Sequence, residues 1–147
     1  MNPVWKHTTN FSGGRGGRSI DRIVIHYIVG TLAAADATFA NPDSGVSAHY
    51  GIGEGKLHQY VSEMNTAWHA GNFAMNQRSI GIEHSADPNR APSSSTYEMS
   101  IDLCTRICRE YGLNPQTQMI PHSSVVSTAC PGTVNLQRIR DAVSARL

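Results

Sequence analysis

The chain lacks long apolar segments and an excess of charge of either sign. No apolar run approaches the ~20 residues that a membrane-spanning helix needs, and the N-terminal residues do not resemble a signal peptide. The net charge is only +1, so the chain has no basic excess suited to nucleic acid, and it has no acidic tail. We therefore expect no membrane span and no nucleic-acid partner.

Cysteine is also scarce. The three cysteines, Cys104, Cys108 and Cys130, are an odd number in a chain without a recognisable secretion signal, which argues against a disulfide framework. Cys104 and Cys108 lie four residues apart in a segment expected to be helical. We interpret them as small apolar residues on one helix face, with a metal or redox pair as the alternative.

The composition is that of a globular protein rich in histidine. Hydrophobic residues make up 39% and charged residues 16% of the 147 residues, which predicts a single domain with a sizeable core. Residues 1–20 are expected to form an N-terminal arm and a Gly-rich loop. Seven histidines are many for this length, and they direct attention to metal or proton chemistry.

Apolar periodicity and turn residues predict strands that alternate with helices. Strands are expected at residues 22–29, 46–52, 56–61 and 79–84, with a hairpin turn at 53–55. Helices are expected at 31–40, 94–111 and 136–147, with Thr31 and Gly112 as caps. The segment before His122 is expected to be extended. This pattern predicts an α/β fold, in which helices flank a central mixed sheet.

One segment combines two potential metal ligands. His122 and Cys130 lie eight residues apart, and Pro131 and Gly132 close the segment. Far upstream, His26 interrupts the apolar run of a buried strand, where a hydrogen-bonded core histidine is an equally good interpretation. Two histidines and a cysteine would leave one tetrahedral position of a zinc ion open, as in catalytic rather than structural sites. If the three residues meet, the chain is expected to be a metal-dependent hydrolase.

Several short motifs occur in a fixed order along the chain. They are residues 23–27 (IVIHY), 46–50 (VSAHY), 67–71 (AWHAG) and 79–83 (SIGIE), followed by His122 and residues 128–132 (TACPG). With this set, the chain from about residue 20 to 145 resembles the N-acetylmuramoyl-L-alanine amidase family. That family includes phage endolysins, bacterial cell-wall amidases and animal peptidoglycan recognition proteins.

The resemblance implies a zinc enzyme that acts on peptidoglycan. It would hydrolyse the amide bond between N-acetylmuramic acid and the L-alanine of the stem peptide, with its zinc site in a surface cleft. The family ligands match His26, His122 and Cys130. Cys130 would then bind zinc as a thiolate and would not be the nucleophile. A Cys/His peptidase is the alternative, but it gives no role to the second histidine.

Two residues are expected to take part in catalysis. Glu83 ends an apolar strand, where burial of a carboxylate costs free energy unless the group has a partner or a function. Burial there would raise its pKa, which suits a general base and acid. Family members with the IGIE motif use this glutamate, whereas others use a tyrosine where this chain has Ala48. An ion pair with Arg78 or Arg90 is the alternative. Thr128 replaces the lysine of many members; it would donate a hydrogen bond to the oxyanion, or else cap its loop.

The remaining site predictions concern the substrate groove. His69 matches a family position that lines this groove, with a surface-loop histidine as the alternative. Its neighbour Trp68 is placed in the groove or in the core, and Asn72 in the same loop could hydrogen-bond substrate. Tyr27 would wall the cleft, and Tyr50 would share a strand face with Ala48.

The expected function is therefore a monomeric peptidoglycan amidase of phage or bacterial origin. An endolysin would reach the wall after release from the host cytoplasm, whereas a recycling amidase would act inside the cytoplasm. A noncatalytic peptidoglycan-binding module is a second hypothesis, and retention of Cys130 argues against it. A zinc peptidase that cuts within the stem peptide is a third.

Overall fold

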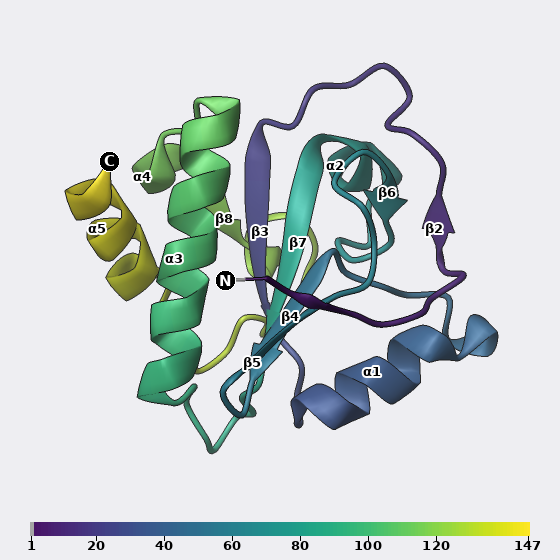
Figure 1. Ribbon diagram of the computed structural model, residues 1–147, viewed down its shortest axis with the longest axis horizontal. Coiled ribbons are helices and arrows are strands. Elements are labelled where there is room, and N and C mark those ends of the chain that lie inside the picture. Colours follow the sequence, from purple (N-terminus) through teal and green to yellow (C-terminus); the bar gives the residue numbers. More distant parts are fainter. Residues whose placement is uncertain (1) are drawn as a thin grey trace.

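The computed structural model describes residues 2–147, which form a mixed β-sheet with helices on both sides (Figure 1). The six strands lie in the order β1-β5-β4-β7-β3-β8. Strands β3, β4, β7 and β8 run parallel, whereas β5 is antiparallel to β4. The strand bounds are β1 (Val4–Trp5), β3 (Arg22–Tyr27), β4 (Tyr50–Gly53), β5 (Lys56–Gln59), β7 (Ser79–His84) and β8 (Met119–Pro121). A separate two-stranded sheet pairs β2 (Phe11–Ser12) with β6 (Thr66–Ala67).

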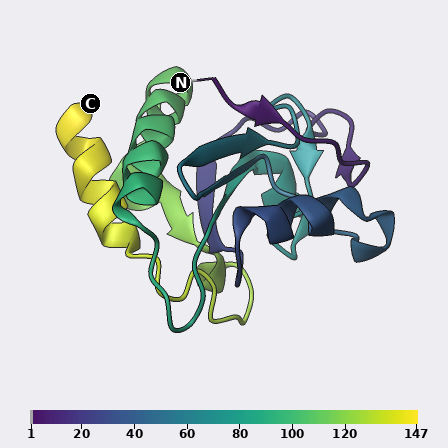
Figure 2. The same cartoon turned by 60° about the horizontal axis from the view of Figure 1, so that its bottom comes forward.

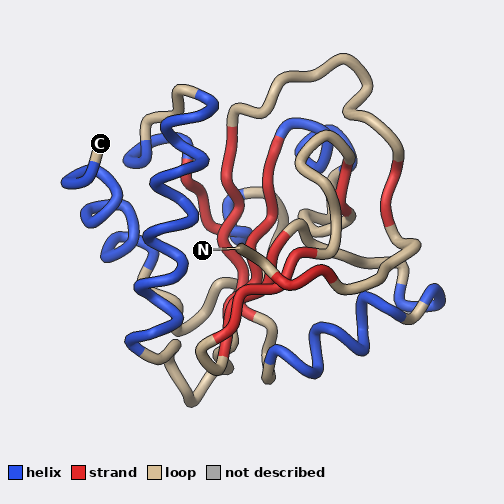
Figure 3. Tube along the Cα trace, viewed as in Figure 1, coloured by secondary structure: helices blue, strands red, loops and turns tan. Residues whose placement is uncertain are grey.

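Helices lie on both sides of this sheet (Figure 2). The long helix α3 (Ser94–Tyr111) packs against α5 (Leu136–Arg146) on one side, together with α4 (Pro115–Gln118). Helix α1 (Leu32–Ala40) lies on the other side, and α2 (Phe73–Arg78) leads directly into β7. Figure 3 shows the strands enclosed between these helices and the loops that join them. Within residues 2–147, no helix has the length and apolar character needed to cross a membrane.

Alternation along β3 and β7 separates the main core from the opposite face of the sheet. Ile25 pairs with Ile82 in the parallel register, and both are fully buried in the core that α3 and α5 cover. Cys104 and Cys108 belong to this same core, as expected for apolar residues on one helix face. The next pair in register, His26 and Glu83, therefore faces the other side, because successive strand residues point to opposite faces.

The predicted α/β fold, the helices and their caps are confirmed. The Thr31 hydroxyl accepts a hydrogen bond from the Ala34 amide, and Gly112 ends α3 in the left-handed conformation with a φ of 67°. The predicted strand at residues 46–52 is wrong in its first half, because β4 begins at Tyr50. Residues 46–49 instead bond to loops and to β7, including the Ser47 amide to the Trp68 carbonyl. Helix α2 and the two-residue strands were not predicted, since such short segments show no periodicity.

The Gly-rich loop of residues 8–18 is anchored by a buried arginine. The guanidinium of Arg15 donates hydrogen bonds of 2.9 Å to the carbonyls of Gln77 and Ser79, at the end of α2. Its Nε atom donates to the Glu63 carbonyl at 2.7 Å. The loop is thereby held against the helix that precedes β7, and the first strand of the site, β3, follows it.

Candidate metal centre and cleft

The structure brings the three predicted ligands together at the carboxyl ends of parallel strands. His26 lies near the end of β3, His122 opens the short 3-10 helix η2 (His122–Ser124) directly after β8, and Cys130 lies in the following loop. One ligand atom from each residue lies within 4.8 Å of the other two. The Nδ1 atom of His26 is 3.6 Å from the Cys130 sulfur. Because parallel strands end at one edge of a sheet, β3 and β8 deliver both histidines to the same place.

The protonation states of this cluster suit a divalent cation. Burial, reinforced by the proximity of His122 and His84, lowers the pKa of His26 well below its ordinary value. Burial also raises the pKa of the Cys130 thiol to about 12. The neutral imidazole is the form that binds metal, and a cation provides the positive charge that a thiolate needs. The same shifts oppose a thiolate–imidazolium pair, which a Cys/His peptidase requires. The donor set therefore fits zinc.

Each histidine of the cluster uses its other ring nitrogen to bond elsewhere in the protein. The Nε2 atom of His26 lies 2.9 Å from Nδ1 of His69, and Nε2 of His122 lies 2.9 Å from the Ala70 carbonyl. Both histidines therefore present Nδ1 to the cluster. The partners of the two outer nitrogens are consecutive residues of one loop.

Glu83 is close to the cluster and has no cationic side chain beside it in the described part of the chain. Its Oε1 atom lies 3.5 Å from Nδ1 of His26, and its side chain is 13% exposed. Burial raises the pKa of Glu83 to about 8. The alternative ion pairs do not form, because Arg78 binds Asp21 and Arg90 binds Asp87. The carboxyl group is therefore not held in an ion pair by either arginine.

Thr128 and Cys130 are linked within their loop. The Thr128 hydroxyl accepts a hydrogen bond of 3.2 Å from the Cys130 amide, which is the loop-capping contact. Thr128 is nevertheless exposed and lines the cleft beside the cluster. Since a hydroxyl that accepts from an amide still has its own proton to donate, capping leaves the oxyanion role available.

The cluster lines a cleft of about 360 Å³. Its other walls are largely apolar and come from the β3–α1 connection, from α1 and from two loops. The side chain of Trp68 is held there by a hydrogen bond of 3.0 Å from its indole nitrogen to the Ser12 hydroxyl. Besides the cluster and its neighbours Glu83 and Thr128, the lining residues are Tyr27, Ile28, Val29, Ala35, Thr38, Phe39, Val46, Ser47, Trp68 and His69.

Comparison with known proteins places this arrangement in a family. Residues 16–133 match the Amidase_2 family, which is described as N-acetylmuramoyl-L-alanine amidase. The chain belongs to the N-acetylmuramoyl-L-alanine amidase family. A similar curated protein, N-acetylmuramoyl-L-alanine amidase A of Achromobacter lyticus, is 31% identical over 115 residues, covering 76% of this chain and 64% of that protein. Amidase BlyA of Bacillus subtilis (strain 168) is 23% identical, covering 88% of this chain and 40% of that protein. The chain thus spans about two fifths to just under two thirds of these relatives.

Solved structures show the same amidase-family fold. A mutant of PlyL aligns with a TM-score of 0.79 and 15% identity, over 99% of both chains. AmpD aligns with a TM-score of 0.77 and 20% identity, over 96% of this chain and 93% of that one. The catalytic domain of XlyA aligns with a TM-score of 0.75 and 21% identity, over 99% and 98%.

Two residues predicted to bind substrate in this amidase-family chain lie outside the cleft. Tyr50 is buried in the core on the α3 side, where its hydroxyl donates to Glu63. It does not share a face with Ala48, because Ala48 precedes the strand and packs in a separate cluster near α1. Asn72 caps α2 by accepting a hydrogen bond of 2.9 Å from the Met75 amide, beside a different surface hollow.

The other predicted groove residues lie at the cleft, and His69 has an additional contact. Tyr27 and Trp68 line the cleft, so Trp68 takes the groove position rather than the core position that was its alternative. His69 also lines it but is only 8% exposed, because its ring packs behind His26. Burial, followed by the nearby His26 and His49, lowers the pKa of His69 well below its ordinary value.

Sequence reasoning missed several residues of this amidase-family site. Val29, Phe39 and Val46 line the cleft, but apolar residues in loops and on α1 have no distinguishing pattern. Ser79 lies beside His69, with its hydroxyl 3.1 Å from Nε2 of the ring, and is the first residue of the SIGIE strand. Its position two residues before Gly81 and four before Glu83 is the signal that it shares their face of β7.

Proposed function

We propose that this chain is a zinc-dependent N-acetylmuramoyl-L-alanine amidase that hydrolyses the bond between N-acetylmuramic acid and L-alanine in peptidoglycan. The observation that supports this best is the convergence of His26, His122 and Cys130 in a cleft, beside the Glu83 carboxyl group. These three side chains would hold the zinc ion. A zinc ion held there supplies Lewis-acid polarisation of the scissile carbonyl.

Glu83 is proposed to move the protons of the reaction. It would accept a proton from the attacking water and deliver it to the nitrogen of L-alanine as the amide bond breaks. Three features support this role: the 3.5 Å approach to His26, the partial burial of the carboxyl group and the lack of an ion pair to Arg78 or Arg90. A carboxyl group in this setting can hold and release a proton near neutral pH.

Thr128 and the cleft walls are proposed to orient the substrate. The exposed hydroxyl of Thr128 can donate a hydrogen bond to the carbonyl oxygen as negative charge develops on it. Tyr27 and Trp68 present aromatic surface beside the cluster, which can pack against the lactyl group, the alanine methyl group or a sugar face. The largely apolar walls would keep bulk water away from the reacting amide.

We further propose that the chain acts as a monomer on the bacterial wall, either as an endolysin or as a bacterial amidase. The decisive experiment is product analysis of purified cell walls by mass spectrometry, with and without a chelator. Release of peptides with free L-alanine amino termini and intact glycan strands supports the amidase. New termini within the stem peptide would identify a peptidase, and tight wall binding without products would identify a binding module.

A further inference from the structure

Three buried side chains connect the metal centre to the backbone of α2. The Nε2 atom of His26 lies 2.9 Å from Nδ1 of His69, and Nε2 of His69 lies 3.1 Å from the Ser79 hydroxyl. That hydroxyl donates a hydrogen bond of 2.6 Å to the Met75 carbonyl. His26, His69 and Ser79 are 1%, 8% and 0% exposed. The contacts therefore form one continuous chain of hydrogen bonds away from solvent.

The donor and the acceptor of each hydrogen bond in this chain follow from its last member, the Met75 carbonyl. The Met75 carbonyl can only accept, so the Ser79 hydroxyl donates to it and accepts from Nε2–H of His69. A neutral imidazole has one donor and one acceptor nitrogen, so Nδ1 of His69 accepts from Nε2–H of His26. His26 is thereby left with a lone pair on Nδ1, the atom that lies 3.6 Å from the Cys130 sulfur.

The ring of His69 occupies a space that the β7 sequence leaves for it. A Cβ atom on Gly81 would overlap the imidazole ring of His69, so a side chain at this position would displace the ring. The Asn76 side chain accepts hydrogen bonds from the amides of His69 and Ala70, at 3.3 and 2.8 Å. The Ala70 carbonyl in turn accepts from Nε2 of His122. A single anchored dipeptide thus supports both histidine ligands.

We propose that His69 and Ser79 are positioning residues of the metal centre, which hold His26 in the tautomer that offers Nδ1 to zinc. This inference rests on the proposed zinc-dependent function and adds a role for the AWHAG and SIGIE segments. His69 acts through His26 and does not need to contact substrate. Partners of the outer nitrogen of a metal-bound histidine typically change metal affinity by roughly 10–100-fold when they are removed.

The test compares variants that retain or remove the acceptor for His26. His69→Leu removes it and leaves a buried N–H unpaired, whereas His69→Asn can place Oδ1 near the position of Nδ1. Zinc affinity is measured by competition with a chromophoric chelator, without substrate. We expect roughly 10–100-fold weaker zinc binding in His69→Leu, substantial recovery in His69→Asn and an intermediate loss in Ser79→Ala.

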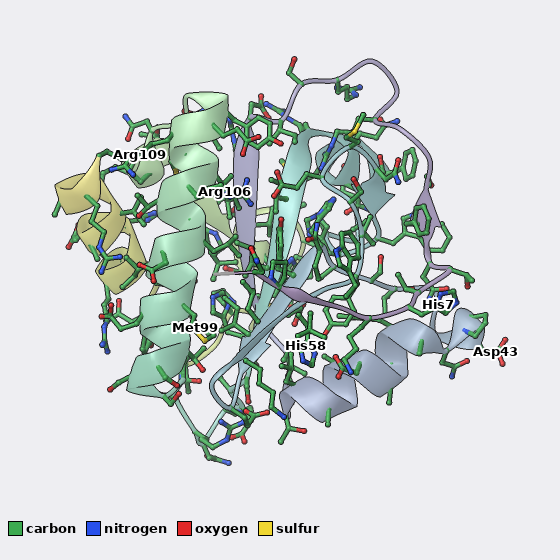
Figure 4. The ribbon with its side chains drawn as sticks, viewed as in Figure 1. His7, Asp43, His58, Met99, Arg106 and Arg109 are labelled. Carbon is green, nitrogen blue, oxygen red and sulfur yellow. The ribbon has the colours of Figure 1, made fainter. Side chains whose placement is uncertain are left out.

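A buried histidine three strands away from His26 in the sheet provides the matched control. His58 lies on β5 (Figure 4). Its Nδ1 atom is 2.9 Å from an Asp36 carboxylate oxygen on α1. His58→Leu should lower the melting temperature of the metal-free protein but leave its zinc affinity unchanged. If His69→Leu also loses only stability and binds zinc as tightly as the parent, the positioning role is wrong.

The imidazole tautomer gives a readout that needs neither metal nor activity. In metal-free protein, ¹⁵N NMR should show His26 protonated on Nε2 and unprotonated on Nδ1, with a mixture of tautomers in Ser79→Ala. An Nδ1–H tautomer in the parent protein would overturn the inference. If the tautomers and zinc affinities are as expected but cell walls yield no amidase products, the proposed function fails and the positioning role stands.

Discussion

The Oε1 atom of Glu83 lies 3.5 Å from Nδ1 of His26, and the two residues are direct partners in the parallel register of β7 and β3. The backbone pairing of two central strands therefore sets the spacing between a proposed proton carrier and a proposed metal ligand. Both arginines that could have neutralised Glu83 are paired with aspartates instead.

Replacing Glu83 by glutamine should separate catalysis from metal binding. The amide retains the size of the carboxyl group but cannot accept the proton of water, so we expect about 10²–10⁴-fold slower turnover. Zinc content should be unchanged, because the three ligands remain. Glu63→Gln is the matched control, since Glu63 is a carboxylate as little exposed as Glu83 but lies outside the cleft, and the variant should retain turnover at pH 7. Near-normal hydrolysis by Glu83→Gln would place the base elsewhere.

Cys130→Ser should abolish both zinc binding and hydrolysis of cell walls. A serine hydroxyl is a poor zinc ligand compared with a thiolate, and the change leaves only His26 and His122. Chelation of the parent protein should have the same effect, and added zinc should restore activity. Cys108→Ala, on the core-facing side of α3, is the control that should retain both properties. Hydrolysis that survives chelation and Cys130→Ser would contradict a zinc mechanism.

Thr128→Val tests the oxyanion role against the loop-capping role. Valine retains the shape but loses the hydroxyl, so both the bond from the Cys130 amide and the proposed bond to substrate are removed. We expect kcat to fall about tenfold, the equivalent of one neutral hydrogen bond in the transition state. Thr128→Ser retains the hydroxyl and should stay near the parent value. A fall in zinc affinity with unchanged kcat at saturating zinc would support capping alone.

Substitution of Val29, which lines the cleft, should increase stability but weaken substrate binding. Val29 is 60% exposed and has a φ of 58°, a left-handed conformation that is strained for a β-branched residue. Val29→Asn should raise the unfolding free energy by about 1 kcal/mol, because asparagine tolerates this conformation. Removal of the apolar wall should also raise KM.

Val46→Asn is the comparison for this prediction. Val46 is also an exposed apolar residue that lines the cleft, but it is not among the described residues with positive φ. Its replacement should raise KM without increasing the melting temperature. Equal melting temperatures for Val29→Asn and the parent would show that the left-handed conformation costs nothing measurable here.

Glu63 should make the fold sensitive to acid. Burial alone would raise its pKa, but hydrogen bonds from Arg106, Tyr50 and Tyr111 outweigh burial and lower the pKa of Glu63 to about 2. Because the folded-state pKa is depressed, this stabilisation is complete above pH ~4.5 and is lost as the pH falls toward 2. In urea unfolding, Glu63→Gln should be less stable than the parent protein at pH 7, and its unfolding free energy should change less between pH 4.5 and 2. Parallel pH profiles of the two proteins would exclude Glu63 as the origin of the acid sensitivity.

The fold class and the main elements follow from local patterns in the sequence. The alternation of Ile80, Gly81, Ile82 and Glu83 already separates a core face from a polar face, because strand side chains alternate. The caps Thr31 and Gly112 mark helix ends by chemistry that needs only a few neighbouring residues. The strand expected at residues 46–49 failed because those residues bond to distant loops, which no local pattern reveals.

The order of the motifs along the chain was enough to predict His26, His122 and Cys130 as metal ligands. Their spatial arrangement follows from the tertiary structure. His26 and Cys130 are separated by 104 positions, and their contact depends on β3 and β8 ending at one edge of the sheet. The structure likewise shows that Tyr50 lies on the core face of the sheet, opposite the cluster, and that His69 contacts the outer ring nitrogen of His26. A hydrogen bond depends on distances and angles between atoms, and these are set by packing across the whole chain rather than by spacing along it.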